Sequence, residues 1–426
     1  MAREKIIVGI DVGSSKITTL ITTSSESELI VIGVSTTVSK GIRKGQVVDI
    51  DEAVSTIAES LEAAERMAGV SASSCYVSVG GAHISSINSR GVVAVAGGEN
   101  EINSDDVRRV VEAAQAISTP SSREIIHVIP RDYIVDSQEG IKDPVGMMGV
   151  RLEVETHIIT GAATSLRNLV KCIQQVGVDV EGLVFSGIAS AEATLTDTER
   201  ELGVALVDIG GGTTDVALFV EGSIAHSAVI PIGGKNITND LAIGLRSSLE
   251  AAEKIKLALS GKESDGSREE VREESKEKNR TVDIDPTKLG VTEDLGPLSK
   301  KTLTEGIIKP RLTEIFTLIG MEIKRAGFAG LLPAGLVVTG GAAETVLLSH
   351  TGKEVLRMPV RIADPKGVGG LIDEISSPAY SNSVGLLTYG EKMLASSTGP
   401  SISLGRGRNL PEIVKKVFSW VRGLLP

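Results

Sequence analysis

The sequence predicts an α/β fold in which two related halves enclose a cleft, with a small α+β module inserted into the first half. Residues 6–18 and 204–220 predict the halves, because each has an apolar run, an acidic residue, a tip rich in glycine or hydroxyl groups, and a second apolar run. Residues 84–160 change to short strands around one helix, which predicts the module. Aromatic residues are only 2% of the chain, so the core must be aliphatic, as is typical of α/β proteins.

The second of these stretches is expected to be a β-hairpin that binds phosphate. Its tip consists of glycines and threonines flanked by two acids: Asp208, Gly210, Gly211, Gly212, Thr213, Thr214 and Asp215. Glycines let the backbone approach a ligand closely, and clustered amide and hydroxyl groups donate hydrogen bonds to phosphate oxygens. Acids beside phosphates suit a Mg²⁺ ion held through water. The alternative is an ordinary tight turn with polar caps.

The first stretch repeats this chemistry near the N-terminus. It combines Asp11 with a tip formed by Gly13, Ser14, Ser15 and Lys16. Two phosphate-binding hairpins about two hundred residues apart are hard to obtain by chance. We therefore expect them to clamp one nucleotide between two similar subdomains.

A third glycine turn is expected to hold the base of that nucleotide. The apolar strand at residues 336–339 runs into Gly340, Gly341 and Ala342, which we expect to open a helix. Bare backbone of this kind lets a flat ring such as a purine lie against it.

Three predicted helices complete the expected cleft. Helices of small residues at 190–195 and 381–390 are expected to cross between the two halves. A further helix, at 249–259, carries Glu253 and Lys256 on one face. By residue chemistry alone, those two form an ordinary surface ion pair.

Composition excludes several classes of protein. The net charge of −11 argues against nucleic acid as a partner. Cys75 and Cys172 are too few and too far apart for a metal site or a disulfide framework, which indicates a reducing compartment. We expect neither a signal peptide nor a membrane-spanning segment, because no apolar run reaches about eighteen residues.

The C-terminal region predicts a tethered amphipathic helix. Residues 396–409 have linker composition, and residues 410–426 place apolar side chains over an arc of about 160°. The residues expected to contact an anionic membrane surface are Ile413, Val414, Val417, Phe418, Trp420, Val421, Leu424 and Leu425, with Lys415, Lys416 and Arg422 on the polar side. The alternative is a helix that docks on the body of the protein or on a partner protein.

Two charged segments are expected to be solvated. The loop at residues 41–45 is interpreted as surface charge, with a partner site as the alternative. Residues 261–280 mix acids and bases without apolar periodicity, which predicts an exposed insertion with no chemistry of its own.

The order of these features resembles the actin, hexokinase and Hsp70 ATPase superfamily. The resemblance implies an actin-like ATPase fold that binds ATP and Mg²⁺, with the two hairpins on the phosphates and the Gly340 turn on the adenosine. It also implies that Glu253 and Lys256 contact the ribose. Asp11, Asp208 and Asp215 would serve as candidate catalytic residues and hold Mg²⁺ through water.

Within that superfamily the chain is most similar to the FtsA family of bacterial cell-division proteins. The inserted module, the segment at residues 141–152 and the amphipathic tail carry this resemblance. The expected organisation is subdomain 1A (1–83, 161–195 and 365–395), module 1C (84–160), subdomain 2A (196–230 and 303–364), subdomain 2B (231–302), linker 396–409 and membrane helix 410–426.

The resemblance implies a polymer-forming protein that tethers FtsZ filaments to the cytoplasmic face of the inner membrane at the division septum. Its implied partners are the C-terminal peptide of FtsZ, FtsN or other division proteins, further copies of the chain, and anionic lipid. Two alternatives remain: a pilus-assembly adaptor of the PilM type and a sugar-kinase-type phosphotransferase. The latter needs an acidic base in an acceptor pocket, which no sequence feature identifies.

Hydrolysis of ATP is expected to be slow. Active members of the superfamily place an acid or amide before the first small-residue helix to orient the attacking water. That place here contains Phe185, Ser186 and Gly187. Tight binding with slow turnover is therefore expected.

Overall fold

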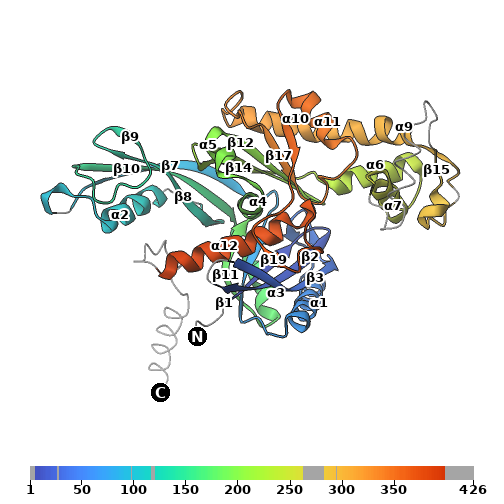
Figure 1. The fold of residues 1–426 in the computed structure, drawn as a ribbon, viewed down its shortest axis with the longest axis horizontal. Helices are drawn as coiled ribbons and strands as arrows, with labels where there is room; N and C mark the ends of the chain where they lie inside the picture. The colour runs from blue at the N-terminus through green and yellow to red at the C-terminus, as the bar shows by residue number, and fades with distance from the viewer. Residues whose placement is uncertain are drawn as a thin grey trace, which may run out of the picture.

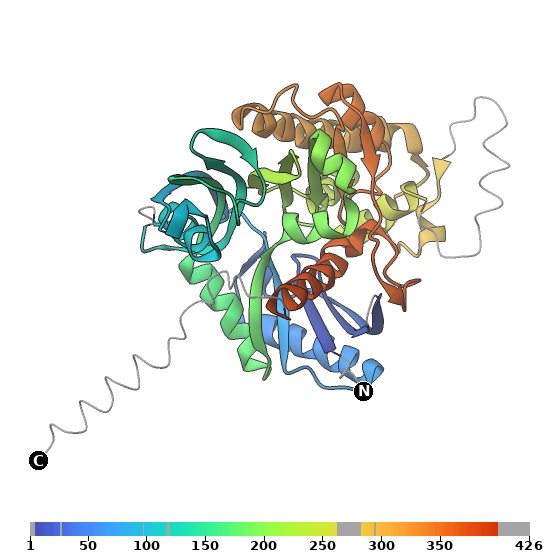
Figure 2. The same ribbon diagram turned by 60° about the vertical axis from the view of Figure 1, so that its left-hand side comes forward.

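The fold was analysed in a computed structural model that describes residues 5–25, 28–96, 98–116, 120–261, 283–293 and 295–398. Within these residues, two core sheets form the body of the molecule, and a smaller sheet belongs to a module that projects from one side (Figures 1 and 2). The α/β class is confirmed.

The first core sheet is built around an N-terminal hairpin. Its strands, in spatial order, are β11 (Asp179–Phe185), β6 (Ser74–Val79), β1 (Lys5–Val12), β2 (Lys16–Ser25), β3 (Glu28–Val38) and β19 (Gly369–Gly370). Strands β1 and β2 are antiparallel and closed by the Val12 and Ile17 pair, whereas β6 runs parallel to β1. Helices α1 (Ile50–Ala68) and α3 (Ala163–Gln175) bury their apolar faces in the same core.

The second core sheet repeats this arrangement. Its order is β14 (Ser223–Ile230), β13 (Thr214–Val220), β12 (Val204–Ile209), β17 (Leu336–Thr339) and β18 (Val360–Ile362). Strands β12 and β13 form an antiparallel hairpin, and β17 runs parallel to β12. An antiparallel hairpin beside a parallel neighbour therefore occurs in both halves, as two related halves require.

Helices cover the second sheet and extend it away from the first. They are α6 (Gly234–Leu245), α7 (Leu249–Leu259), α10 (Lys309–Arg325) and α11 (Leu348–Leu356), with the apolar faces of α6, α7 and α10 in one core. Shorter elements connect these parts: β4 (Ile42–Arg43), β5 (Gln46–Val47), α5 (Asp197–Leu202), β15 (Asp283–Ile284), β16 (Leu298–Ser299) and α9 (Lys300–Leu303).

Two helices of small residues cross where the halves meet. Helix α4 (Ser186–Thr194) packs against α12 (Ser381–Thr398), as the sequence predicts (Figure 1). The backbones approach so closely that a Cβ on Gly385 would lie 1.7 Å from the carbonyl oxygen of Ala189. Only glycine allows that contact.

The inserted module has its own sheet and core. The sheet order is β7 (Ser85–Ala94), β10 (Arg151–Ala162), β8 (Arg123–Val135) and β9 (Gln138–Ile141), with α2 (Ser104–Gln115) packed on it. A polar contact joins it to the second half, because the imidazole of His157 bonds to Asn88 Oδ1 at 2.6 Å and to Ser227 Oγ at 2.9 Å. The module is therefore fixed to β14 as well as to the first half.

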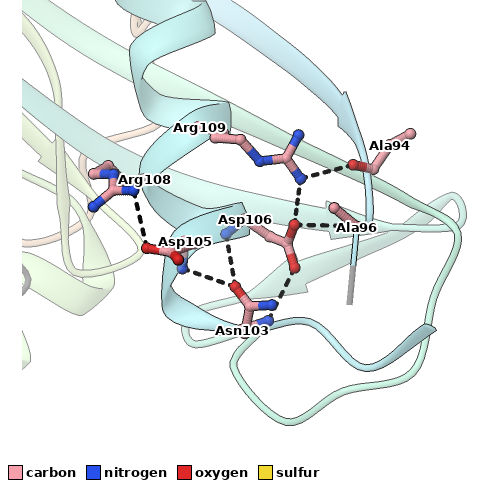
Figure 3. A network of polar contacts seen from close by, with 7 residues as sticks. All are labelled: Ala94, Ala96, Asn103, Asp105, Asp106, Arg108 and Arg109. Atoms are coloured by element: carbon pink, nitrogen blue, oxygen red, sulfur yellow. Dashed lines mark hydrogen bonds and ion pairs between the residues drawn. The ribbon is translucent and has the colours of Figure 1, made fainter. Parts of the chain in front are cut away.

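A capping network fixes helix α2 to the end of β7 (Figure 3). Asn103 Oδ1 accepts hydrogen bonds from the amides of Asp105 and Asp106, and Asp106 accepts in return from the amide of Asn103. Asp106 also binds Arg109 and the amide of Ala96. Burial alone would raise the pKa of Asp106, but these hydrogen bonds outweigh it and lower that pKa.

Four expectations about element boundaries need correction. Helix α12 runs to Thr398, so residues 396–398 belong to it rather than to the linker; Gly399 and Pro400 come next in the sequence. Helix α4 starts at Ser186 rather than at residue 190, since it is held by burial and has no side-chain cap for the sequence to reveal.

The other two corrections concern the second half. The Gly340 turn is followed by further turns, and the next helix begins only at Leu348. Residues 303–325 have the apolar spacing of one long helix, but a π-helical turn at Thr304–Ile308 interrupts it, just before Pro310, which lacks an amide hydrogen for the regular ladder. The charged segment at 261–280 (except Gly261), the rest of the linker and the amphipathic helix at 410–426 lie outside the described residues.

The α2 network predicts a specific loss of stability. Replacing Asp106 with alanine removes the reciprocal cap and the partner of Arg109, so we expect the free energy of unfolding to fall by about 2 kcal/mol. Asp105→Ala is the matched control, because its carboxylate is exposed and pairs only with Arg108 on the surface. Denaturant unfolding of both variants measures the difference. Equal losses would contradict the assigned role of Asp106.

Candidate functional site

A cleft with a volume of about 660 Å³ opens between the two halves. The tips of both hairpins line it, together with the start of α6, one face of α7, the Gly340 turn and the start of α12. Segments far apart in the sequence thus meet at one place, as a nucleotide clamp requires.

The two hairpin tips have the same local structure and lie against each other. The amide of Gly13 donates to the carbonyl oxygen of Lys16 at 3.1 Å. In the same way, the amide of Gly210 donates to the carbonyl oxygen of Thr213 at 2.9 Å. A Cβ on Gly211 would lie 1.9 Å from Ser15 Oγ. Contact with the opposite tip therefore requires a glycine at position 211, whether or not a ligand also approaches this backbone.

Nearly all residues predicted for the site line the cleft. Those brought together are Asp11, Gly13, Ser14, Ser15, Lys16, Asp208, Gly210, Gly211, Gly212, Thr213, Asp215, Glu253, Lys256, Gly340, Gly341 and Ala342. Thr214 is the exception: it is fully buried, and its hydroxyl donates to the carbonyl of Ile232 at 2.8 Å. Its side chain supports the base of the hairpin instead of facing the cleft.

The Gly340 turn is locked to the second hairpin. Gly340 has a φ of 90°, and a Cβ there would lie 2.2 Å from Asp208 Oδ1. The amide of Ala342 bonds to the carbonyl of Ile209 at 2.9 Å. The expected base-binding turn and phosphate-binding hairpin therefore form one rigid unit.

Glu253 and Lys256 form part of a polar group in which the lysine is buried and the glutamate is partly exposed. Glu253 Oε2 accepts hydrogen bonds from Thr238 Oγ1 at 2.5 Å and from Lys256 Nζ at 2.7 Å. Lys256 is only 8% exposed, so the pair is not an ordinary surface ion pair. It connects α6 to α7 at the edge of the cleft.

Three buried carboxylates gather at the floor of the cleft. Asp11 accepts hydrogen bonds from Ser78 at 2.7 Å, from Asn382 at 2.9 Å and from Ser383 at 3.3 Å. Asp208 accepts one from Ser190 at 2.5 Å. Helices α4 and α12 therefore each orient one of the acids.

The electrostatics of these acids favour a cation. Burial raises the pKa of Asp208 to about 6, and the charge of Asp11 adds to the increase. Burial, followed by the charges of Asp208 and Asp11, holds the pKa of Asp215 well above its ordinary value. Burial also raises the pKa of Asp11, against the hydrogen bond from Ser78. A nearby positive charge would stabilise all three as carboxylates.

The acids suit a hydrated Mg²⁺ ion better than a directly ligated one. Asp215 Oδ1 is buried and has no hydrogen-bond partner in the described protein, so it can accept from metal-bound water. Across the described ranges, no three His, Cys, Asp or Glu side chains are placed to hold a metal directly. Mg²⁺ characteristically keeps several of its waters and binds substrate phosphates, which fits this arrangement.

Sequence reasoning missed several residues of the cleft. Asn382 and Lys235 both line it, and each had a usable signal: an amide at the start of a small-residue helix, and a lysine after a glycine pair. Ser78 had none, since it is one polar residue in a buried strand. Gly45, in a loop interpreted as surface charge, donates its amide to Ser14 Oγ at 2.9 Å and also lines the cleft.

The raised pKa of Asp208 predicts a pH-dependent stability. The folded chain holds this proton more tightly than the unfolded chain, where the pKa is near 3.8, so the stabilisation is lost as pH rises through about 6. Without divalent cations, we expect Asp208 to make the protein less stable at about pH 7 than at about pH 5, by roughly 1 kcal/mol.

Asp208→Asn removes the titrating group and should reduce this slope, as thermal unfolding across the pH range can measure. Asp373→Asn changes an exposed carboxylate and serves as the control. An unchanged slope in Asp208→Asn would show that Asp208 is not the titrating group.

Comparison with known proteins identifies the family. The family described as "SHS2 domain inserted in FTSA" matches residues 81–160, and that described as "Cell division protein FtsA" matches residues 205–385. The chain is 39% identical to the cell division protein FtsA of Pseudomonas aeruginosa, over 98% of each chain. It is 40% identical to that of Borreliella burgdorferi over 90% of each chain, and 34% identical to that of Escherichia coli K12 over 99% of this chain and 96% of the relative.

Solved structures show the fold. A PilM–PilN type IV pilus biogenesis complex matches with a TM-score of 0.62 at 14% identity, covering 90% of this chain and 98% of that chain. MreB5 of Spiroplasma citri bound to AMPPNP matches with a TM-score of 0.54 at 12% identity, covering 93% of this chain and 99% of that one. The expected actin-like ATPase fold with an inserted module is confirmed, and the chain belongs to the FtsA family of cell-division proteins.

Proposed function

We propose that this chain binds Mg·ATP in the cleft and that the bound nucleotide sets its polymer state at the cytoplasmic face of the inner membrane. There it would tether FtsZ filaments at the division septum. The observation that carries the proposal is the meeting of two matched glycine hairpins over three buried carboxylates. Membership of the FtsA family supports the role in cell division.

Each wall of the cleft would take one part of the nucleotide. The amides and hydroxyls of the two tips donate to phosphate oxygens, and the Gly340 turn leaves bare backbone for the base. Glu253 and Lys256, which line the cleft, would bind the ribose hydroxyls. Asp11, Asp208 and Asp215 would hold the waters of Mg²⁺, which when bound would neutralise charge on the phosphates.

Slow hydrolysis follows from the start of α4. Ser186 lines the cleft there, and its hydroxyl lies near Gly80, which also approaches the carboxylate of Asp215. A serine hydroxyl is a poor base, so this position cannot take a proton from water as a carboxylate would. Asp11 and Asp208 are also held in place for a cation by their hydrogen bonds.

Nucleotide binding can be tested at the contact between the tips. Gly211→Val would force a side chain into Ser15, so we expect at least a tenfold loss of affinity for Mg·ATP, measured with a fluorescent ATP analogue. Gly98→Val is the control, because its Cβ would meet open space. The unmodified protein should turn over ATP far more slowly than the roughly 10 per second of a typical enzyme. Turnover of many ATP per second would contradict this mechanism.

Membrane attachment is proposed for the amphipathic segment at residues 410–426. Its apolar arc and basic side chains suit an anionic lipid surface. None of the helices in the described part of the chain is long and apolar enough to span a bilayer. The proposed protein partners are the C-terminal peptide of FtsZ on the region near residues 235–310, FtsN or other division proteins on the inserted module, and further copies of the chain.

Deletion of residues 410–426 should separate lipid binding from nucleotide binding. We expect the truncated protein to bind Mg·ATP as before but not to sediment with anionic liposomes. Electron microscopy with ATP, Mg²⁺ and anionic lipid should show membrane-bound filaments only for the full chain. Undiminished sedimentation of the truncated protein would refute the assignment.

A PilM-like adaptor is the second candidate, because the PilM–PilN complex has the TM-score of 0.62 noted above. An adaptor of this kind would use the same cleft for nucleotide and would bind a different partner. A pull-down with the C-terminal peptide of FtsZ distinguishes the two candidates.

A further inference from the structure

Lys235 connects the two halves across the mouth of the phosphate site. Its Nζ donates a hydrogen bond to the carbonyl oxygen of Ser14 at 2.6 Å, although the residues are 221 positions apart. Lys235 lies in the first turn of α6, in the second half, and Ser14 lies at the tip of the first hairpin. Both residues line the cleft.

The backbone of Lys235 is attached to the second hairpin. Its amide donates to the carbonyl of Gly211 at 2.8 Å, and the amide of Gly234 donates to that of Gly210 at 2.9 Å. The start of α6 therefore moves with the second tip. Only the side chain of Lys235 reaches the first tip, so its ammonium can leave Ser14 without disturbing the helix.

The partner of this ammonium carries no formal charge, whereas the neighbouring Lys256 binds a carboxylate. Lys256 binds the carboxylate of Glu253, and the ammonium of Lys16 lies 3.3 Å from the centre of the Tyr380 ring. Lys235 instead binds a neutral carbonyl. Burial lowers its pKa, with the charge of Glu253 opposing that effect. An anion arriving in the cleft would therefore be a better partner than Ser14.

The phosphates of a nucleotide supply such an anion. Hydrogen bonds between an ammonium and a phosphate oxygen are roughly twice as strong as those between neutral groups. Each added phosphate increases the negative charge within reach of Lys235, so a triphosphate attracts it more strongly than a diphosphate. Ser14 would keep the bond from Gly45 to its hydroxyl but lose the one to its carbonyl.

We propose that Lys235 is a positioning residue that ties the Ser14 tip to α6 and leaves Ser14 for the outer phosphates of a nucleoside polyphosphate when one binds. This latch rests on the proposed nucleotide function. It makes the number of phosphates determine whether Lys235 is linked to the first tip directly or through the ligand.

Nucleotide affinities of Lys235 variants test the latch. We expect Lys235→Met to weaken Mg·ATP binding about tenfold and Mg·ADP binding about threefold, since the charge of each phosphate contributes. Lys235→Arg keeps the charge and should restore most of the affinity. Lys353→Met, on the exposed face of α11, is the matched control and should change neither.

Equal losses for ATP and ADP, or none, would overturn the latch while leaving nucleotide binding intact. Failure of the unmodified protein to bind ATP would overturn the proposed function and the latch together. The two failures are therefore distinguishable in one set of titrations.

Hydrogen exchange provides a readout that does not depend on affinity. In the nucleotide-free protein, Lys235→Met should exchange faster than the unmodified chain at the amides of residues 13–18, because the tip has lost its cross-cleft bond. The Lys353→Met control should match the unmodified protein. Identical exchange in Lys235→Met would show that the Ser14 contact does not hold the tip.

Discussion

The close contact between the two hairpin tips is the constraint on which the rest of the structure depends. The side chain of Ser15 occupies the space that a side chain at Gly211 would need, so the second tip can approach the first only as bare backbone. That meeting fixes how far apart the halves lie and turns two separate turns into one donor-lined surface. The acids below, the Gly340 turn and α7 all take their positions relative to this contact.

Sequence reasoning found the parts of the site that carry a local signature. Glycine runs between apolar strands, and acids beside them, mark the hairpins wherever they occur, so Asp11, Asp208 and Asp215 could be found without coordinates. The side chains that form hydrogen bonds to these acids could not be found in this way. Ser78 and Ser190 reach the acids only because β6 and α4 pass beneath the cleft, and a single serine in an apolar segment gives no sign of that.

The boundaries of elements were harder to predict because packing decided them. Helix α4 begins at Ser186 without a capping side chain. Gly340 leads into turns because the backbone amides that follow it, such as that of Ala343, donate to carbonyls three residues earlier and form consecutive turns instead of an α-helix. Thr214 belongs to the glycine-rich motif by sequence, but its side chain points away from the cleft, because alternate residues of a strand point to opposite faces of the sheet. In each case the fold overrode a reasonable local pattern.

The crossing of α4 and α12 has a mechanical consequence. At Gly385 and Ala189 the helices touch backbone to backbone, which leaves no room for a side chain between them. Close to that contact, α4 orients Asp208 through Ser190, and α12 orients Asp11 through Asn382 and Ser383. Any change in the way α4 and α12 cross would therefore alter the separation of these two carboxylates, so the helix crossing and the charge cluster are coupled.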